Sequence, residues 1–298
     1  MPHWKLILAY DGTPYNGWQI QPNLPTVQGT LAQAIQRVTG ETILPQGSGR
    51  TDTGVHALAQ VATFSLTVPI PAANLHRALN NALPASIRVL SVEAVREDFH
   101  ARHSAQRKTY EYRILPCDND ARICSPMLAP YVWPCRLSLD LTILQQAATH
   151  ILGIHDFTSF AANDPDQAAR NAANESAAAE VIRSPQPDPK DVISTGGGAF
   201  AAAVEKSASL PLLPTSPVDN IRTIYHSAWH RQEDLLIYRV TGSGFLHHMV
   251  RNLVGTFVEA AANRISANEI PNILAARNRS AAGPTAPASG LFLVEVEY

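Results

Sequence analysis

The sequence has little that would point to a disulfide framework or a zinc site. Its 298 residues include only three cysteines, Cys117, Cys124 and Cys135, and no two of them have Cys-x-x-Cys spacing. An odd number of cysteines without that spacing predicts free thiols in a reducing compartment.

Long apolar runs and an export signal are lacking too. No uninterrupted apolar stretch approaches the roughly 18 residues that a membrane span requires. The first ten residues contain no basic region and no small-residue cleavage site, so they predict a strand rather than a signal peptide. We therefore expect a cytoplasmic protein without membrane association.

A strong excess of either charge is also missing. Lysine and arginine number 23 against 25 acids, so the net charge of -2 gives no global sign of nucleic-acid binding. The charges are unevenly distributed, however. Residues 99–113 hold four lysines and arginines against one acid, whereas residues 161–217 carry seven acids and four bases. Any basic patch must therefore be local.

The first half of the chain alternates strand and helix patterns. A helix is expected between Thr26, a plausible N-cap, and Gly40, which would end it. The other expected elements are strands at 4–10, 58–66 and 87–95 and a short helix at 74–83. This β-α-β-α-β order predicts an α+β domain of the split-βαβ kind.

The second half follows a similar order, so a structural duplication is a hypothesis. Ser138 is expected to cap a helix that reaches residue 152. The other expected elements are strands at 108–115, 221–231, 235–241 and 291–298 and a long helix at 245–262. We predict two ferredoxin-like domains, 1–104 and 105–298, whose strands form a mainly antiparallel sheet flanked by helices.

Residues 161–217 differ in composition from the rest of the second half. They hold fourteen alanines and seven prolines and show little periodicity. We interpret them as a surface insertion that is flexible or weakly helical. A lid or docking arm is the functional alternative.

One turn-rich segment, 47–54, combines three glycines with Arg50 and Asp52. Glycines allow backbone to approach a ligand closely. A single loop can then present an arginine that holds phosphate and an aspartate that works on a sugar or base. The alternative is a β-turn whose aspartate accepts backbone N–H bonds, which is the better interpretation of an arbitrary Arg-x-Asp.

The string from Gly49 to Ala57, GRTDTGVHA, resembles the active-site motif of the tRNA pseudouridine synthase A family. Further segments resemble that family in the same order: 10–19, 26–29, 98–102, 108–113, 156–160, 244–252 and 290–293. The resemblance covers nearly the whole chain except 161–217, which takes the place of a short connection.

This resemblance implies a fold with an active-site cleft between its two halves, and it implies an activity. Asp52 would be the catalytic carboxylate, and Tyr110 would contact the target uracil by stacking. The reaction would isomerise uridine at positions 38–40 of the tRNA anticodon stem-loop. A homodimer would bind the tRNA. Pseudouridine formation demands no redox cofactor or metal, so none is expected.

Arg251 could pair with the catalytic carboxylate, contact a phosphate or lie on a helix surface. The adjacent His247 and His248, like His100 and His103, suggest a metal site. We expect none, because adjacent histidines of a helix point to different faces and no third ligand is evident.

Three alternatives remain open. A related eukaryotic-type synthase would act on a broader range of RNAs. A non-catalytic RNA-binding module could use the same fold, although the intact Arg50, Asp52 and Tyr110 argue against it. A nucleoside hydrolase would be expected to show a second carboxylate paired with the first.

Overall fold

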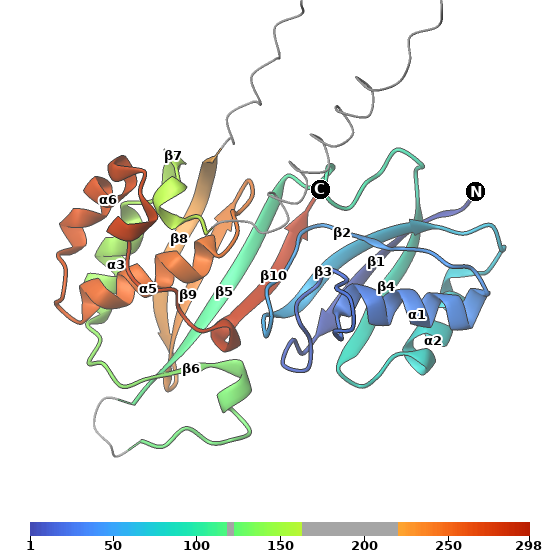
Figure 1. Ribbon diagram of the computed structural model, residues 1–298, viewed down its shortest axis with the longest axis horizontal. Coiled ribbons are helices and arrows are strands. Elements are labelled where there is room, and N and C mark those ends of the chain that lie inside the picture. Colours follow the sequence, from blue (N-terminus) through green and yellow to red (C-terminus); the bar gives the residue numbers. More distant parts are fainter. Residues whose placement is uncertain (118–121, 163–219) are drawn as a thin grey trace, which may run out of the picture. The chain divides into compact units, whose positions relative to one another are not determined.

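A computed structural model describes residues 1–117, 122–162 and 220–298. Its main feature in these ranges is a 10-stranded sheet with the order β4-β1-β3-β10-β5-β9-β8-β7 (Figure 1). These strands are β4 (Ile87–Val95), β1 (His3–Tyr10), β3 (His56–Ser65), β10 (Leu291–Glu297), β5 (Arg107–Pro116), β9 (Leu235–Gly242), β8 (Ile221–Gln232) and β7 (Gly153–Asp156). Two short strands complete the sheet: β2 (Gln46–Gly47) on β3 and β6 (Trp133–Cys135) on β5.

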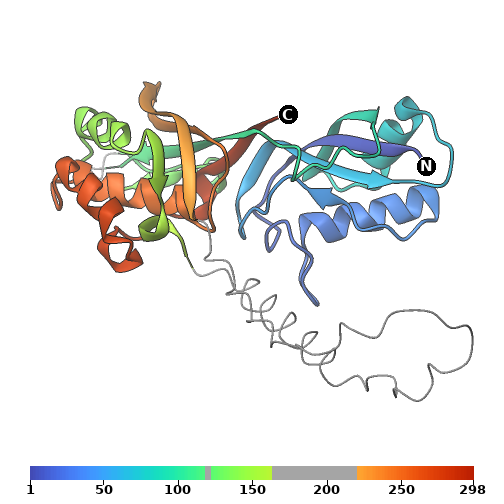
Figure 2. The ribbon, with the colours of Figure 1, turned by 90° about the horizontal axis from the view of Figure 1, so that it is seen from above.

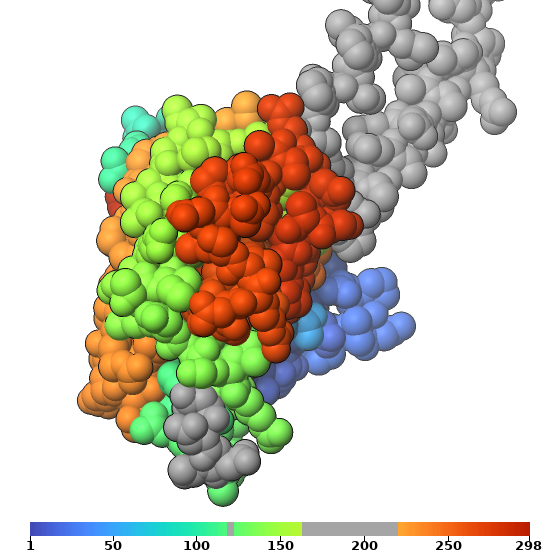
Figure 3. Space-filling view, turned by 90° about the vertical axis from the view of Figure 1, so that its left-hand side faces the viewer, coloured from blue at the N-terminus to red at the C-terminus, as the bar shows by residue number. Residues whose placement is uncertain are grey.

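Most neighbouring strands are antiparallel; the parallel pairs are β10 with β3 and β5 with β6. Helices α1 (Val27–Thr39) and α2 (Ala72–Ala82) accompany the N-terminal strands, and α3 (Leu141–Thr149), α5 (Met249–Ala261) and α6 (Ile270–Ala276) accompany β8 and β9 (Figures 1 and 2). Figure 3 shows the α6 segment, in red-orange, lying against the α3 segment, in green. The predicted α+β class is confirmed.

The described residues cluster in one compact unit. The sheet continues across the predicted boundary at 104 and 105, and the division into two domains stays a prediction. The predicted insertion lies outside the described residues apart from Ala161 and Ala162. In the described part of the chain, no helix is both long and apolar enough to cross a bilayer.

Helix α1 begins and ends as its sequence predicts. Thr26 accepts a hydrogen bond from the Gly29 N–H, which satisfies one donor of the first turn. Gly40 ends the helix at φ 78°, and its N–H donates to the Gln36 carbonyl at 2.8 Å. Local cap chemistry therefore fixes the helix that packs beside α2.

Two helices of the second half begin later than predicted. Helix α3 is capped by Asp140 rather than Ser138, because the Asp140 carboxylate accepts the Thr142 N–H at 2.7 Å. Helix α5 begins at Met249 rather than Phe245, since His248 before it has φ 59°, which no α-helix contains. The predicted helix start was therefore wrong by four residues.

The C-terminal strand joins the two sets of strands. β10 pairs with β3 in parallel at Phe292 with His56 and at Leu293 with Ala57. The His56 ring stacks on Phe292 with ring centroids 4.7 Å apart. Because β3 starts directly after the Asp52 loop, this junction fixes the base of that loop.

Candidate active site

The loop that carries Asp52 is held by the loop that follows β1. The Trp18 N–H donates to the Thr51 carbonyl at 3.0 Å, and the Gly54 N–H donates to the Tyr15 carbonyl at 3.3 Å. The Thr51 hydroxyl lies 2.8 Å from the buried Tyr10 hydroxyl. These bonds flank Asp52 on both sides, so its backbone is fixed by contacts between segments far apart in the sequence.

His56 holds the end of the same loop, and its hydrogen bonds require a single protonation state of the imidazole. Its Nδ1 accepts the Gly12 N–H at 3.0 Å, so its Nε2 must carry the hydrogen that points at the Pro130 carbonyl, 2.9 Å away. Burial lowers the pKa of His56 more than Pro130 and the Asp11 carboxylate raise it. The histidine is therefore neutral near pH 7. A Cβ on Gly12 would meet the Val55 carbonyl oxygen, so only glycine fits there.

The other end of the loop is held by Gln60 and Lys108. The Ser48 hydroxyl donates to Gln60 Oε1 at 2.6 Å, and Gln60 Nε2 donates to the Gly49 carbonyl at 3.0 Å. Lys108 Nζ donates to the Ser48 carbonyl at 2.7 Å. The segment 48–56 is thus secured at both ends.

Lys108 also belongs to a positive part of the surface. Burial, together with the charges of Arg102 and Arg222, lowers the pKa of Lys108 to about 8. Two other cations of the predicted basic segment have local partners: Arg113 pairs with a carboxylate of its own strand at 2.8 Å, and Arg107 lies over the Tyr225 ring at 4.6 Å. Because the charges of Arg102 and Arg222 act on Lys108, these three side chains form the basic cluster beside the loop.

Three side chains from one segment converge on the Asp52 carboxylate. Arg251 Nη1 lies 3.1 Å from Oδ2, His248 Nε2 lies 3.3 Å from Oδ2, and His247 Nε2 lies 3.5 Å from Oδ1. The Asp52 side chain keeps 19% of its surface exposed. The carboxylate is thus oriented by contacts yet open to a ligand.

Both histidines face Asp52 because they precede the helix. The left-handed backbone of His248 turns its side chain to the same side as His247, and the two rings stack with centroids 4.0 Å apart. The expectation that they point to different faces was wrong, since it assumed a helix at these residues. Burial lowers the pKa of His248, Asp52 opposes this, and His247 and Arg251 add to the lowering.

Arg251 is itself oriented by backbone. Its Nε donates to the Ala286 carbonyl at 2.8 Å, and the Ala286 N–H donates to the Arg251 carbonyl at 3.1 Å. The next residue, Asn252, is fully buried and donates to the Phe160 carbonyl at 2.7 Å. The guanidinium is therefore held between the backbone at residue 286 and the Asp52 carboxylate. Of the three alternatives predicted for Arg251, this is the pairing with the carboxylate.

Tyr110 lies on β5 and is 8% exposed. Burial raises the pKa of its hydroxyl, and the nearby Tyr10 and the Asp52 charge raise it further. The Phe245 ring meets it edge-on with centroids 5.0 Å apart. Tyr110 is thus protonated and close to Asp52. Phe245 lies beside Tyr110, a contact that the sequence did not predict.

Arg50 is exposed on the same loop, two residues before Asp52. Its contact with phosphate stays a prediction. The structure thus brings Asp52, Arg251 and Tyr110 together. Sequence reasoning missed the roles of His247 and His248, although the preceding Gly-Ser-Gly turn could have signalled a later helix start.

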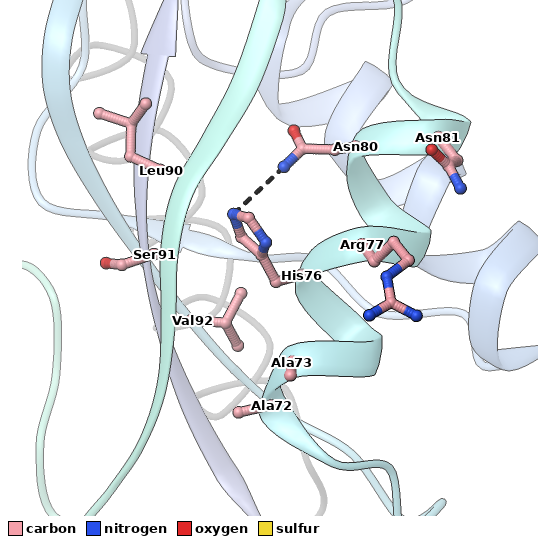
Figure 4. A pocket seen from close by; sticks show the side chains of 9 residues that line it. All are labelled: Ala72, Ala73, His76, Arg77, Asn80, Asn81, Leu90, Ser91 and Val92. Carbon is pink, nitrogen blue, oxygen red and sulfur yellow. Dashed lines mark hydrogen bonds between the residues drawn. The ribbon is translucent and has the colours of Figure 1, made fainter.

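A pocket lies apart from this cluster, between α2 and β4 (Figure 4). Two of its polar side chains bond to β4 backbone: His76 Nε2 and Asn80 Nδ2 each lie 2.9 Å from the Val89 carbonyl. None of its lining residues belongs to the Asp52 cluster. These contacts explain His76 and Asn80 as supports for the α2–β4 packing.

Comparison with known proteins places the chain in a family. The profile described as tRNA pseudouridine synthase matches residues 6–104 and 213–298. A tRNA pseudouridine synthase A of Solibacter usitatus is 41% identical over 99% of this chain and 98% of its own. Those of Moorella thermoacetica and Halalkalibacterium halodurans are 38% and 39% identical, over 100% and 96% of this chain and 100% and 89% of their own. The chain therefore belongs to the tRNA pseudouridine synthase A family, whose members are isomerases.

Proposed function

We propose that this enzyme isomerises uridine to pseudouridine at positions 38–40 of the tRNA anticodon stem-loop, with Asp52 as the catalytic carboxylate. The observation that carries the proposal is the convergence of Arg251, His247 and His248 on Asp52 in a chain of this family. The relatives are named tRNA pseudouridine synthase A, which supports tRNA as the substrate. The target positions and the role of Asp52 are our inference.

The reaction needs a carboxylate and little else. The N1–C1′ bond of uridine breaks, the uracil rotates, and a C5–C1′ bond forms. The proton on C5 leaves, and N1 takes up a proton, so the product is an isomer of uridine. The atoms of the nucleoside are otherwise conserved, and nothing is oxidised. Asp52 can serve as the nucleophile at the sugar or the base, or as the base that removes a sugar proton.

The neighbours of Asp52 supply orientation. Arg251 fixes the carboxylate through a charge-assisted hydrogen bond. Extruding the uridine costs a few kcal/mol, which stacking on Tyr110, worth about 1–3 kcal/mol, would offset. Tyr110 is 8% exposed and Phe245 meets it edge-on, so stacking of the uracil would require neighbouring side chains to move. Arg50 and the basic cluster of Arg102, Lys108 and Arg222 would hold phosphates.

Shape recognition of a folded RNA suits a chain with little net charge. We propose a homodimer in the cytoplasm, with tRNA bound along the sheet junction that carries the Asp52 loop. Analytical ultracentrifugation with and without tRNA measures the dimer directly.

Tritium release tests the activity. The substrate is an anticodon stem-loop RNA with uridines labelled at C5, since the C5 proton leaves only when the new bond forms. Wild type should release tritium, and Asp52→Asn, which keeps the shape but loses the charge, should not. The matched control is Asp98→Asn, an exposed carboxylate paired with Arg96 at 3.3 Å, which should behave as wild type.

The outcomes also separate the alternatives. Release from Asp52→Asn would contradict the assigned role. RNA binding by wild type without release would favour the non-catalytic module. Equal rates on unrelated stem-loops would favour the eukaryotic-type synthase with broader targets.

A further inference from the structure

We infer that Asp52, His247 and His248 form a binding site for a divalent cation of the Zn²⁺ and Co²⁺ class, and that this cation inhibits the enzyme. The inhibitory effect rests on the proposed function of Asp52. Binding of the cation does not, because it follows from the arrangement of the three side chains alone.

The three side chains are close enough together to hold one cation. His247 Nε2 lies 3.5 Å from Asp52 Oδ1 and His248 Nε2 lies 3.3 Å from Oδ2; with one ligand atom from each residue, all three lie within 4.8 Å of one another. Bonds of about 2.0–2.1 Å in a tetrahedron place neighbouring ligand atoms about 3.4 Å apart. Two imidazoles and one carboxylate are also the protein ligands of many zinc sites that keep a fourth position open.

Backbone and solvent access favour the same site. His248 occupies the left-handed region at φ 59°, a strained conformation for a non-glycine residue. Such conformations cluster at ligand sites. The three side chains are 19–30% exposed, so a cation can enter from solvent.

Arg251 sets the limit on affinity. Its Nη1 lies 3.1 Å from Asp52 Oδ2, so a cation must share the carboxylate with a guanidinium. Repulsion between the two positive charges weakens binding. We therefore expect a reversible inhibitor rather than a resident cofactor, and we expect Arg251→Gln to bind the cation more tightly than wild type.

Inhibition follows from the same geometry. A cation bound at Asp52 occupies the lone pairs that the proposed reaction needs, and it stands where the uridine sugar would approach the carboxylate. Removing the cation with a chelator should restore the rate of the reaction.

Cobalt titration of the full-length protein tests the site without using activity, because tetrahedral Co²⁺ absorbs visible light. We expect saturable absorbance with wild type and at least about tenfold weaker binding with Asp52→Asn and with the double variant His247→Gln, His248→Gln. The matched control is the double variant His100→Gln, His103→Gln, whose rings lie 4.4 Å apart; it should bind as wild type. Urea unfolding confirms that each variant is folded.

Absent absorbance in wild type, or unchanged absorbance in the His247 and His248 variant, would overturn the inference whatever the enzyme's activity. In the tritium assay, Zn²⁺ should slow wild type and the control pair alike, and each single histidine variant should need about tenfold more Zn²⁺. Cobalt binding without any tritium release would support the site and reject the proposed function, so the two can fail separately.

Discussion

The loop 47–57 and the segment 242–251 meet at Asp52, yet they are built in different ways. The loop is held at both ends by hydrogen bonds to the segment after β1 and to Gln60 and Lys108. The facing segment owes its shape to one left-handed residue, His248, and to the start of α5. The carboxylate is thus fixed by contacts between distant segments. The two histidines that face it depend on a local backbone conformation, and Arg251 depends on the Ala286 carbonyl as well.

Replacing Arg251, the positively charged side chain of the facing segment, should have the largest effect on the rate. We expect Arg251→Gln to lower kcat about 100-fold or more, because loss of one oriented charged donor costs about that much, while KM for RNA changes less. Arg251→Lys should recover part of kcat, since lysine keeps the charge but not the planar fork. Steady-state kinetics measure both.

Arg264→Gln is the control for that substitution, since Arg264 forms an exposed pair with Glu259. A rate of Arg251→Gln within a few-fold of wild type would mean that the loop alone positions Asp52.

Two glycines test the supports of the two regions in parallel. A Cβ at Gly12 would meet the Val55 carbonyl oxygen under the loop, and one at Gly255 would meet the Pro284 carbonyl oxygen behind Arg251. We expect Gly12→Ala and Gly255→Ala each to lower the free energy of unfolding by about 3 kcal/mol, measured by urea denaturation. Gly244→Ala, whose Cβ would lie 3.6 Å from Arg222 Nε, should cost far less. Equal losses of unfolding free energy in all three variants would contradict the close approach of backbone carbonyls to Gly12 and Gly255.

The loop should also show a pH signature. Burial lowers the pKa of His56 in the folded state, so below the unfolded value of about 6.5 the unfolded chain binds a proton that the folded chain refuses. Stability is therefore full above that pH and falls as the pH drops. We expect His56→Gln to reduce the slope of unfolding free energy against pH between about pH 6.5 and 5. An unchanged slope would contradict a neutral His56.

The smallest effect tests the left-handed residue. His248→Gly should be about 1 kcal/mol more stable than His248→Ala, because glycine adopts φ 59° without strain. At Glu259, inside α5, the order should reverse, with alanine more stable than glycine by about 1 kcal/mol. Urea unfolding of these four variants measures both differences. If His248→Ala were more stable to unfolding than His248→Gly, a left-handed backbone at residue 248 would be contradicted.

The same contrast explains what the sequence could predict. Helix α1 was predicted within a residue at each end, because Thr26 and Gly40 carry local cap chemistry. The strand at 87–95 was predicted with its observed bounds. Such features depend on neighbours in the sequence. The Asp52 loop was found through a contiguous motif, for the same reason.

The facing segment could not be predicted in this way. Phe245 continues the helical spacing of the apolar residues in α5, yet it packs against Tyr110 on another element. Periodicity cannot show where the backbone leaves the helix. The Gly-Ser-Gly turn at 242–244 indicates a later helix start but does not show that His248 is left-handed. The pairing of Arg251 with Asp52 joins residues 199 positions apart, and only the family resemblance suggested it.

One measurement tests the central claim most directly: position-resolved detection of pseudouridine in a full-length tRNA treated with wild type or with Asp52→Asn. We predict pseudouridine at uridines of positions 38–40 with wild type and unmodified uridine there with the variant, although both bind the tRNA. Pseudouridine formed by Asp52→Asn, or none formed by wild type, would contradict the account.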